Sequence, residues 1–160
     1  MEIPTKCILL VEDNPSDVAL TQRALRKARI GNEIIVAENG QIALDYLFGS
    51  SAHDGMVKSG LPTVILLDLN LPKVPGLEVL RRIREDPRTH RQPVVILSTS
   101  NEPDDVSAGY DLGVNSYITK PVNFTQFAQV VEQLGLYWLL LNELPPARRG
   151  SSETRQSAAV

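Results

Sequence analysis

Acidic side chains follow two apolar segments of this sequence, at the points where those segments end. Glu12 and Asp13 come directly after residues 7–11, and Asp68 follows residues 64–67. Three carboxylates brought together repel one another, and their pKa values rise unless a cation is present. Mg²⁺ prefers oxygen ligands and takes one or two carboxylates together with several waters. These residues therefore predict a divalent-metal site at Glu12, Asp13 and Asp68.

A hydroxyl and a cation follow two later apolar segments. Ser98 comes after residues 94–97, and Lys120 comes after residues 116–119. A metal ion, an ammonium and a hydroxyl together can hold the three oxygens of a phosphoryl group. The remaining requirement is a nucleophile, and a carboxylate can act as one. Asp68 is expected at the centre of the predicted sheet, and it is therefore the predicted phosphoacceptor.

Apolar segments of strand length alternate with segments of helical periodicity along the chain. The expected strands are residues 7–11, 33–37, 64–67, 94–97 and 116–119. The expected helices are residues 14–31, 39–48, 77–84, 104–112 and 124–141, and residues 50–61 are expected to form a loop. This alternation predicts an α/β fold, a doubly wound five-stranded parallel sheet with five helices. The flavodoxin-like strand order 2-1-3-4-5 is among the few that right-handed crossovers allow, and its ligands bind at the carboxyl ends of the strands.

Length and composition limit the classes of protein to which the chain can belong. Its 160 residues suffice for one domain, and the formal net charge of -3 does not favour nucleic acid as a partner. No apolar run approaches the roughly 18 residues that a membrane span requires. The single cysteine, Cys7, rules out an intramolecular disulfide and agrees with a reducing compartment. We therefore expect a cytoplasmic protein without a membrane or nucleic-acid partner.

The last expected helix has two apolar faces. One stripe follows helical spacing and is expected to face the core: Phe124, Phe127, Val131, Leu134, Trp138 and Leu141. The second face predicts contact with another chain, most simply in a symmetric dimer, although a core helix over-rich in leucine is the alternative. The predicted interface consists of Val130, Tyr137, Trp138, Leu140, Leu141 and Leu144.

Four short motifs occur in order at the ends of the expected strands: LLVEDN, ILLDLNLP, VILSTS and YITKP. In these motifs the chain resembles the receiver domain of two-component response regulators, over residues 6–142. The resemblance implies a receiver domain at residues 1–143, and the proline- and arginine-containing residues 144–160 are expected to be a disordered tail. It also implies a signalling protein that accepts a phosphoryl group and loses it by hydrolysis, with no external substrate to turn over.

The resemblance assigns a role to each residue at the strand ends. It implies that a sensor histidine kinase transfers a phosphoryl group from its phosphohistidine to Asp68. Mg²⁺ would be bound by Asp13, Asp68 and the backbone carbonyl of Asn70, while Glu12 would act largely through water.

The resemblance also implies a conformational switch. Lys120 would pair with the phosphate, and the Lys120–Pro121 peptide bond would be cis. Ser98 would move onto the phosphoryl group, and Tyr117 would change rotamer in response. Because too little chain follows for an effector domain, the output would be contact with another protein or onward phosphoryl transfer.

Three further features of the sequence resemble one subgroup of these regulators. The LGLYWLLLNELP end, the long loop after DYLF and the NLPKVPG turn are similar to small single-domain regulators that pair with phytochrome-type light-sensing kinases. In that subgroup the regulator is a homodimer, and its kinase responds to red and far-red light.

Two other functions remain as alternatives. A phosphatase of the haloacid-dehalogenase type also forms an aspartyl phosphate, although it is expected to carry a second aspartate where Asn70 stands. The chain could also be an intermediate receiver in a phosphorelay unrelated to light. A nucleotide-binding fold is not favoured, because neither G-x-x-x-x-G-K nor G-x-G-x-x-G occurs.

Overall fold

Five parallel strands form a single sheet in the order β2-β1-β3-β4-β5. The computed structural model describes residues 7–50 and 55–146. The strands are β1 (Cys7–Val11), β2 (Glu33–Ala37), β3 (Val64–Leu67), β4 (Val94–Ser98) and β5 (Ser116–Thr119). This arrangement confirms the predicted flavodoxin-like fold and places β3 at the centre of the sheet.

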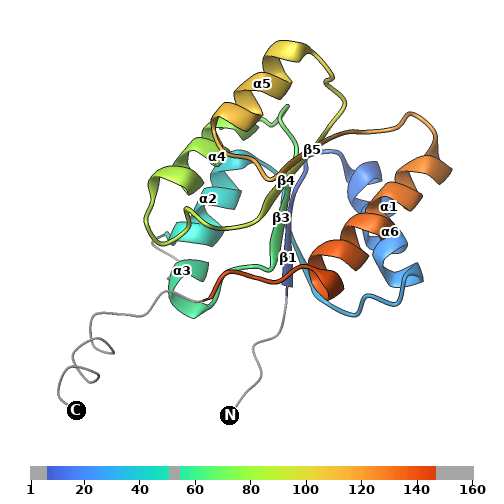
Figure 1. Cartoon of the computed structure of the whole chain (residues 1–160), viewed down its shortest axis with the longest axis horizontal. Coiled ribbons are helices and arrows are strands. Elements are labelled where there is room, and N and C mark those ends of the chain that lie inside the picture. The colour runs from blue at the N-terminus through green and yellow to red at the C-terminus, as the bar shows by residue number, and fades with distance from the viewer. Residues whose placement is uncertain (1–6, 51–54, 147–160) are drawn as a thin grey trace, which may run out of the picture.

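Helices cover both faces of the sheet. They are α1 (Pro15–Lys27), α2 (Gly40–Phe48), α3 (Met56–Ser59), α4 (Gly76–Glu85), α5 (Pro103–Asp111), α6 (Phe124–Leu136) and a π-helical turn, η1 (Tyr137–Leu141). Figure 1 shows α1 and α6 on one face and α2, α4 and α5 on the other. The short α3 lies within residues 50–61, where the sequence predicted only a loop. Within the described residues, no helix is long and apolar enough to cross a membrane.

Each central strand contributes to two separate cores. Leu9 and Ile65 belong to the core beneath α2 and α4, whereas Ile8 and Leu66 belong to the core beneath α1 and α6. Because successive side chains of a strand point to opposite faces, a strand covered on both sides is apolar throughout. This double burial explains why the strands read as continuous apolar runs and why they end abruptly at polar residues.

Asparagine side chains begin three of the helices. The Asn14 side chain accepts hydrogen bonds from the backbone N–H groups of Ser16 and Asp17 at the start of α1. Asn39 and Asn123 cap α2 and α6 in the same way. An N-cap of this kind stabilises a helix by about 1 kcal/mol. The caps start α1, α2 and α6 directly beyond the carboxyl ends of β1, β2 and β5, and so fix the edge where polar side chains meet.

The C-terminal helix differs from the single helix predicted for residues 124–141. It is α-helical only to Leu136, after which the Asn142 N–H donates to the Tyr137 carbonyl at 2.7 Å, in the i to i+5 pattern of a π-helix. The wider turn changes the rotation from one residue to the next, so side chains within it point in other directions than in a regular α-helix. Leu139 is therefore buried, at 2% exposed, while Leu141 is 73% exposed. The expectation that Leu141 faces the core is wrong for this reason.

Phe124 and Trp138 also depart from the expected core stripe. Phe124 begins α6 beside the exposed Asn123 cap and is 71% exposed, since the first turn of the helix is exposed as a whole. Trp138 is only partly buried against the core beneath α1 and α6. The expectation that Phe124 packs in the core is wrong, whereas Phe127, Val131 and Leu134 are buried as expected.

After η1 the chain turns back rather than extending the axis of α6. Figure 1 shows this segment, in red, running beneath the sheet toward α3. Arg91 donates to the Pro146 carbonyl at 3.4 Å. Residues 144–146 are exposed. The rest of the predicted tail, residues 147–160, lies outside the described residues, so the expected disorder of residues 144–160 stays a prediction.

Candidate functional site

The polar residues predicted from the strand ends meet at the carboxyl edge of the sheet. Glu12 follows β1, Asp68 follows β3, Ser98 ends β4 and Lys120 follows β5. All four are buried, with Glu12 at 4%, Asp68 at 7%, Ser98 at 0% and Lys120 at 8% exposed. Buried polar groups of this kind must find partners within the protein. The edge is therefore a built polar site rather than a set of solvated surface charges.

The ammonium group of Lys120 joins three acidic side chains. Its Nζ donates to Glu12 Oε2 at 2.5 Å, to Asp17 Oδ2 at 2.9 Å and to Asp68 Oδ2 at 3.2 Å. An ammonium has three N–H donors, so these contacts use all of them. Lys120 thus lies directly beside the predicted phosphoacceptor.

The predicted metal ligands are also close together. Oxygen atoms from Glu12, Asp13 and Asp68 all lie within 4.8 Å of one another. Asp13 is exposed, while the other two are buried. Carboxylate oxygens open to water on one side suit a hard divalent cation that keeps part of its hydration shell. The donor set therefore fits a divalent metal site, and Asn70, whose N–H donates to Asp68 Oδ1 at 3.3 Å, lies next to it.

Burial and ion pairing shift the pKa values of the two most buried charges. Burial raises the pKa of Glu12 to about 7, although its hydrogen bond with Lys120 acts in the opposite direction. Burial alone would lower the pKa of Lys120, but its hydrogen bonds with Glu12 and Asp17 and the charge of Asp68 raise it. Lys120 therefore remains an ammonium.

The residues predicted to form the switch meet at Ser100. The Ser98 hydroxyl oxygen accepts a hydrogen bond from the Ser100 N–H at 3.3 Å. The half-buried Tyr117 donates its hydroxyl to the Ser100 carbonyl at 2.7 Å, and Ser100 Oγ donates to Asp105 Oδ2 at 2.5 Å. Ser98 and Tyr117 are thus linked through one residue of the loop between β4 and α5.

Comparison with known proteins identifies the family. A family model described as "Response regulator receiver domain" matches residues 8–132. The chain belongs to the response regulator receiver family. Response regulator Rcp1 of Synechocystis sp. is 42% identical over 144 residues, which cover 90% of this chain and 96% of Rcp1. The probable methanogenesis regulatory protein FilR2 of Methanothrix harundinacea is 43% identical over 138 residues, which cover 86% of each protein.

Solved structures extend this similarity to the three-dimensional fold. The phosphorylated cyanobacterial phytochrome response regulator RcpA has a TM-score of 0.80 and 43% identity, over 88% of this chain and 99% of RcpA. The Mn²⁺-bound form of Rcp1 also has a TM-score of 0.80, with 40% identity over 88% and 99% of the two chains. The receiver is therefore a two-component signalling protein similar to phytochrome response regulators. It is not an enzyme, and the haloacid-dehalogenase alternative is removed.

The peptide bond between Lys120 and Pro121 differs from the prediction. No cis peptide bond occurs among the described residues, so this bond is trans and the predicted cis bond is wrong. The trans form of a bond before proline is favoured by about 0.5–1 kcal/mol. In the trans form Lys120 still reaches all three acidic partners, so its contacts in the receiver do not require the cis form.

Two acidic residues of the receiver site were missed by reasoning from strand ends. Asp17 pairs with Lys120, and Asp105 bonds to Ser100, yet each lies in the first turn of a helix rather than at the end of a strand. The helices that follow parallel strands start at the same edge as the site. An acid in the first turn of such a helix is therefore the signal in the sequence that could have identified Asp17 and Asp105.

The predicted dimer residues fall into two groups. Tyr137, Leu140, Leu141 and Leu144 are exposed, whereas Val130 and Trp138 are half-buried. A surface cavity of about 630 Å³ between β5 and the end of α6 is lined in part by Ile118, Val130 and Trp138. Exposed apolar side chains are thus present where the interface was predicted, although the π-helical turn redistributes them.

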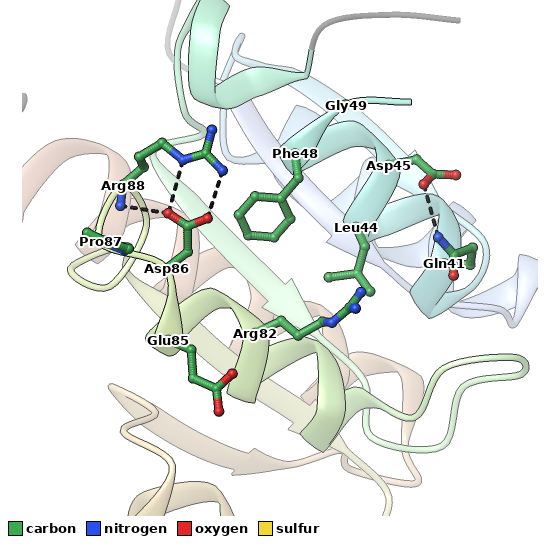
Figure 2. A pocket seen from close by; sticks show the side chains of 10 residues that line it. All are labelled: Gln41, Leu44, Asp45, Phe48, Gly49, Arg82, Glu85, Asp86, Pro87 and Arg88. Atoms are coloured by element: carbon green, nitrogen blue, oxygen red, sulfur yellow. Dashed lines mark hydrogen bonds and ion pairs between the residues drawn. The ribbon is translucent and has the colours of Figure 1, made fainter. Parts of the chain in front are cut away.

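A second cavity lies between α2 and α4, away from the acidic site. It has a volume of about 520 Å³, and Figure 2 shows Leu44 and Phe48 between charged side chains on either side. Arg88 lies over the Phe48 ring at 5.8 Å and pairs with Asp86 at 2.7 Å. None of Glu12, Asp13, Asp17, Asp68 and Lys120 lines this cavity.

Proposed function

We propose that this receiver accepts a phosphoryl group on Asp68 from the phosphohistidine of a sensor histidine kinase. The observation that carries the proposal is the contact at 3.2 Å between Lys120 Nζ and Asp68 Oδ2 in a buried site. An ammonium beside a carboxylate nucleophile offsets the negative charge that an incoming phosphoryl group brings. Asp68 also comes directly after the central strand β3, and the other groups of the site lie at the ends of β1, β4 and β5.

The transfer needs no group beyond the two proteins and a metal ion. An Asp68 carboxylate oxygen attacks phosphorus, and the bond from phosphorus to the histidine nitrogen breaks. The bonding pair stays with that nitrogen, which takes up a proton. In the later hydrolysis water attacks phosphorus, the bond to the Asp68 oxygen breaks, and inorganic phosphate leaves the restored carboxylate.

The metal ligands follow from the same arrangement. We assign Asp13, Asp68 and the backbone carbonyl of Asn70 to Mg²⁺, with Glu12 acting largely through water. Bound Mg²⁺ would supply positive charge to the phosphoryl oxygens during transfer. The support is the set of oxygen atoms within 4.8 Å of one another and the exposure of Asp13, which leaves room for water ligands.

Phosphorylation is proposed to shift a conformational equilibrium. Ser98 and Lys120 would each donate to a phosphoryl oxygen, contacts that exist only after transfer. Movement of Ser98 would release its contact with the Ser100 N–H, and Tyr117 would change rotamer as its bond to the Ser100 carbonyl breaks. The shared contact at Ser100 supports this coupling.

We propose a phytochrome-type light sensor as the kinase. The similarity to RcpA supports it, although FilR2 is as similar and its name refers to methanogenesis. The output is proposed to be protein contact by a homodimer in the cytoplasm, without nucleic acid or membrane. The exposed Tyr137, Leu140 and Leu141 support the dimer. The family match over residues 8–132 supports a receiver domain at residues 1–143, with 144–160 as its tail.

Phosphoryl transfer from a small panel of autophosphorylated histidine kinases tests the proposal. The panel includes one phytochrome, and the controls are Asp68→Asn and removal of Mg²⁺ by a chelator. Fast uptake from the phytochrome that needs both Asp68 and Mg²⁺ would support the receiver chemistry and the light-sensing partner. Uptake from another kinase alone would support the phosphoryl transfer to Asp68 and overturn the proposal that the kinase is a light sensor. Uptake by Asp68→Asn would overturn the phosphoacceptor.

A further inference from the structure

We propose that Asp17 is a positioning residue, which holds the Lys120 ammonium in place beside the phosphoacceptor. The inference rests on the proposed function, because it concerns how fast Asp68 accepts a phosphoryl group. Asp17 lies on helix α1, outside the predicted metal cluster. In the described hydrogen bonds its carboxylate contacts Lys120 and not Asp68.

The geometry gives Lys120 two anchors and one working contact. Glu12 at 2.5 Å and Asp17 at 2.9 Å hold Nζ more closely than Asp68 does at 3.2 Å. When Asp68 becomes an aspartyl phosphate, its charge moves to the phosphoryl oxygens, and the third N–H can follow it while the other two stay in place. A lysine held in this way loses little freedom during the reaction, because its orientation is set beforehand.

The backbone of Asp17 is held by hydrogen bonds on both sides. The Thr21 hydroxyl, which is buried, donates to the Asp17 carbonyl at 2.7 Å, and Asn14 accepts from the Asp17 N–H at 3.3 Å. Helix α1 packs closely on α6, since a Cβ added at Gly135 would lie 2.7 Å from Leu25 Cδ2. The Asp17 carboxylate thus projects from a fixed helix toward a lysine 103 positions later in the chain.

A simpler role for Asp17 is to complement the positive end of α1. An acid in the first turn of a helix contributes about 0.3–1 kcal/mol in this way. That role needs no contact with Lys120, whereas Asp17 Oδ2 lies within hydrogen-bonding distance of Nζ. Asp17 is also the least buried of the three partners, with its side chain 24% exposed, so its charge can be removed without opening the core. The two roles therefore separate experimentally.

The test measures phosphorylation of the Asp17→Asn variant by acetyl phosphate. The phosphoryl group passes from acetyl phosphate to an Asp68 oxygen, and acetate leaves. We expect phosphorylation to slow by roughly threefold to tenfold, since Lys120 loses one charged anchor. Mg²⁺ affinity is expected to stay within about twofold, because Asp17 is not a ligand. The matched control is Asp104→Asn, which removes an exposed acid from the first turn of α5 and is expected to leave the rate unchanged.

A double-mutant cycle shows whether Asp17 acts through Lys120. In a Lys120→Met background, the further change Asp17→Asn is expected to alter the rate by less than about twofold. An equal loss with and without Lys120 would overturn the proposal, as would a wild-type rate for Asp17→Asn alone. A wild-type rate for the single variant overturns the proposal even if Lys120→Met does not fold.

Failure of this inference is distinct from failure of the proposed function. Phosphorylation that needs Asp68 but is indifferent to Asp17 would overturn the positioning role and leave the receiver chemistry intact. Absence of phosphorylation in the wild-type protein, from acetyl phosphate and from every kinase, would overturn both.

Discussion

The carboxyl edge of the sheet and the end of α6 differ in which side chains they bury and which they expose. At the sheet edge, charged side chains are buried and each has a partner, as Lys120 has in Glu12, Asp17 and Asp68. At the end of α6, apolar side chains such as Leu140 and Leu141 are exposed, at 69% and 73%. The charges of the first region are paired within one chain, whereas the second region leaves apolar side chains exposed to water. The polar site is therefore defined by contacts within the chain, whereas the role of the apolar end depends on a partner surface.

The largest effect is expected from removing the cation of the sheet edge. Lys120→Met leaves three carboxylates without their shared partner, and breaking a buried ion pair from one side costs roughly 3–5 kcal/mol. Urea unfolding in the presence of a chelator measures the loss. Mg²⁺ is expected to restore part of it, since the metal supplies replacement charge. A change below about 1 kcal/mol would mean that water, not Lys120, stabilises these acids.

The π-helical turn predicts opposite results for two neighbouring leucines. Leu139→Ala removes a side chain that is 2% exposed and is expected to cost about 2–4 kcal/mol of unfolding free energy. Leu141→Ala, its matched control at 73% exposed, is expected to change stability by less than about 0.5 kcal/mol in the monomer. Thermal unfolding at low protein concentration compares them. The reverse order would mean that α6 continues as a regular α-helix.

The apolar end of α6 is expected to hold the proposed dimer together. Leu140→Asp places a charge in the interface and is expected to raise the dimer dissociation constant at least tenfold, or about 1.4 kcal/mol. Gln129→Asp, on an exposed part of the same helix, serves as the control. Sedimentation velocity over a range of concentrations measures both. A dimer that tolerates Leu140→Asp uses another surface, and a monomeric wild type removes the interface.

Metal binding is expected to stabilise the sheet edge and to leave the α6 end unaffected. Mg²⁺ at ten times its dissociation constant stabilises the folded state by about 1.4 kcal/mol through mass action. Asp13→Asn is expected to abolish this gain, because it removes the exposed carboxylate of the cluster. Thermal melts with Mg²⁺ and with chelator give the comparison. An undiminished gain in Asp13→Asn would place the metal elsewhere.

The smallest effect concerns the loop that follows Asp68. Lys73 has a φ of 68°, in the left-handed region that glycine adopts at little cost. Lys73→Gly relieves this conformation but makes the unfolded chain more flexible, so we expect a net stabilisation of at most about 1 kcal/mol. Urea unfolding is sensitive enough to measure it. A loss above about 1 kcal/mol would reveal a contact of the Lys73 side chain.

The sequence could predict the fold because its signals are local and are combined by a general rule. Continuous apolar runs such as residues 64–67 indicate strands covered on both faces, and right-handed crossovers then leave few strand orders. The same rule places Glu12, Asp68, Ser98 and Lys120 at one edge, where the structure brings them together. Their chemical roles remain predictions, because proximity alone does not show a reaction.

Other features depended on how separate elements pack. The sequence determined which side chains reach the carboxyl edge, since strand ends and helix starts are encoded by short local patterns. Only the tertiary structure decided that Asp17 pairs with Lys120, because 103 positions separate them and the distance depends on the placement of α1. It likewise decided that Leu139 is buried and Leu141 exposed. The same residues can form either an α-helical or a π-helical turn, and packing against the core selects between the two.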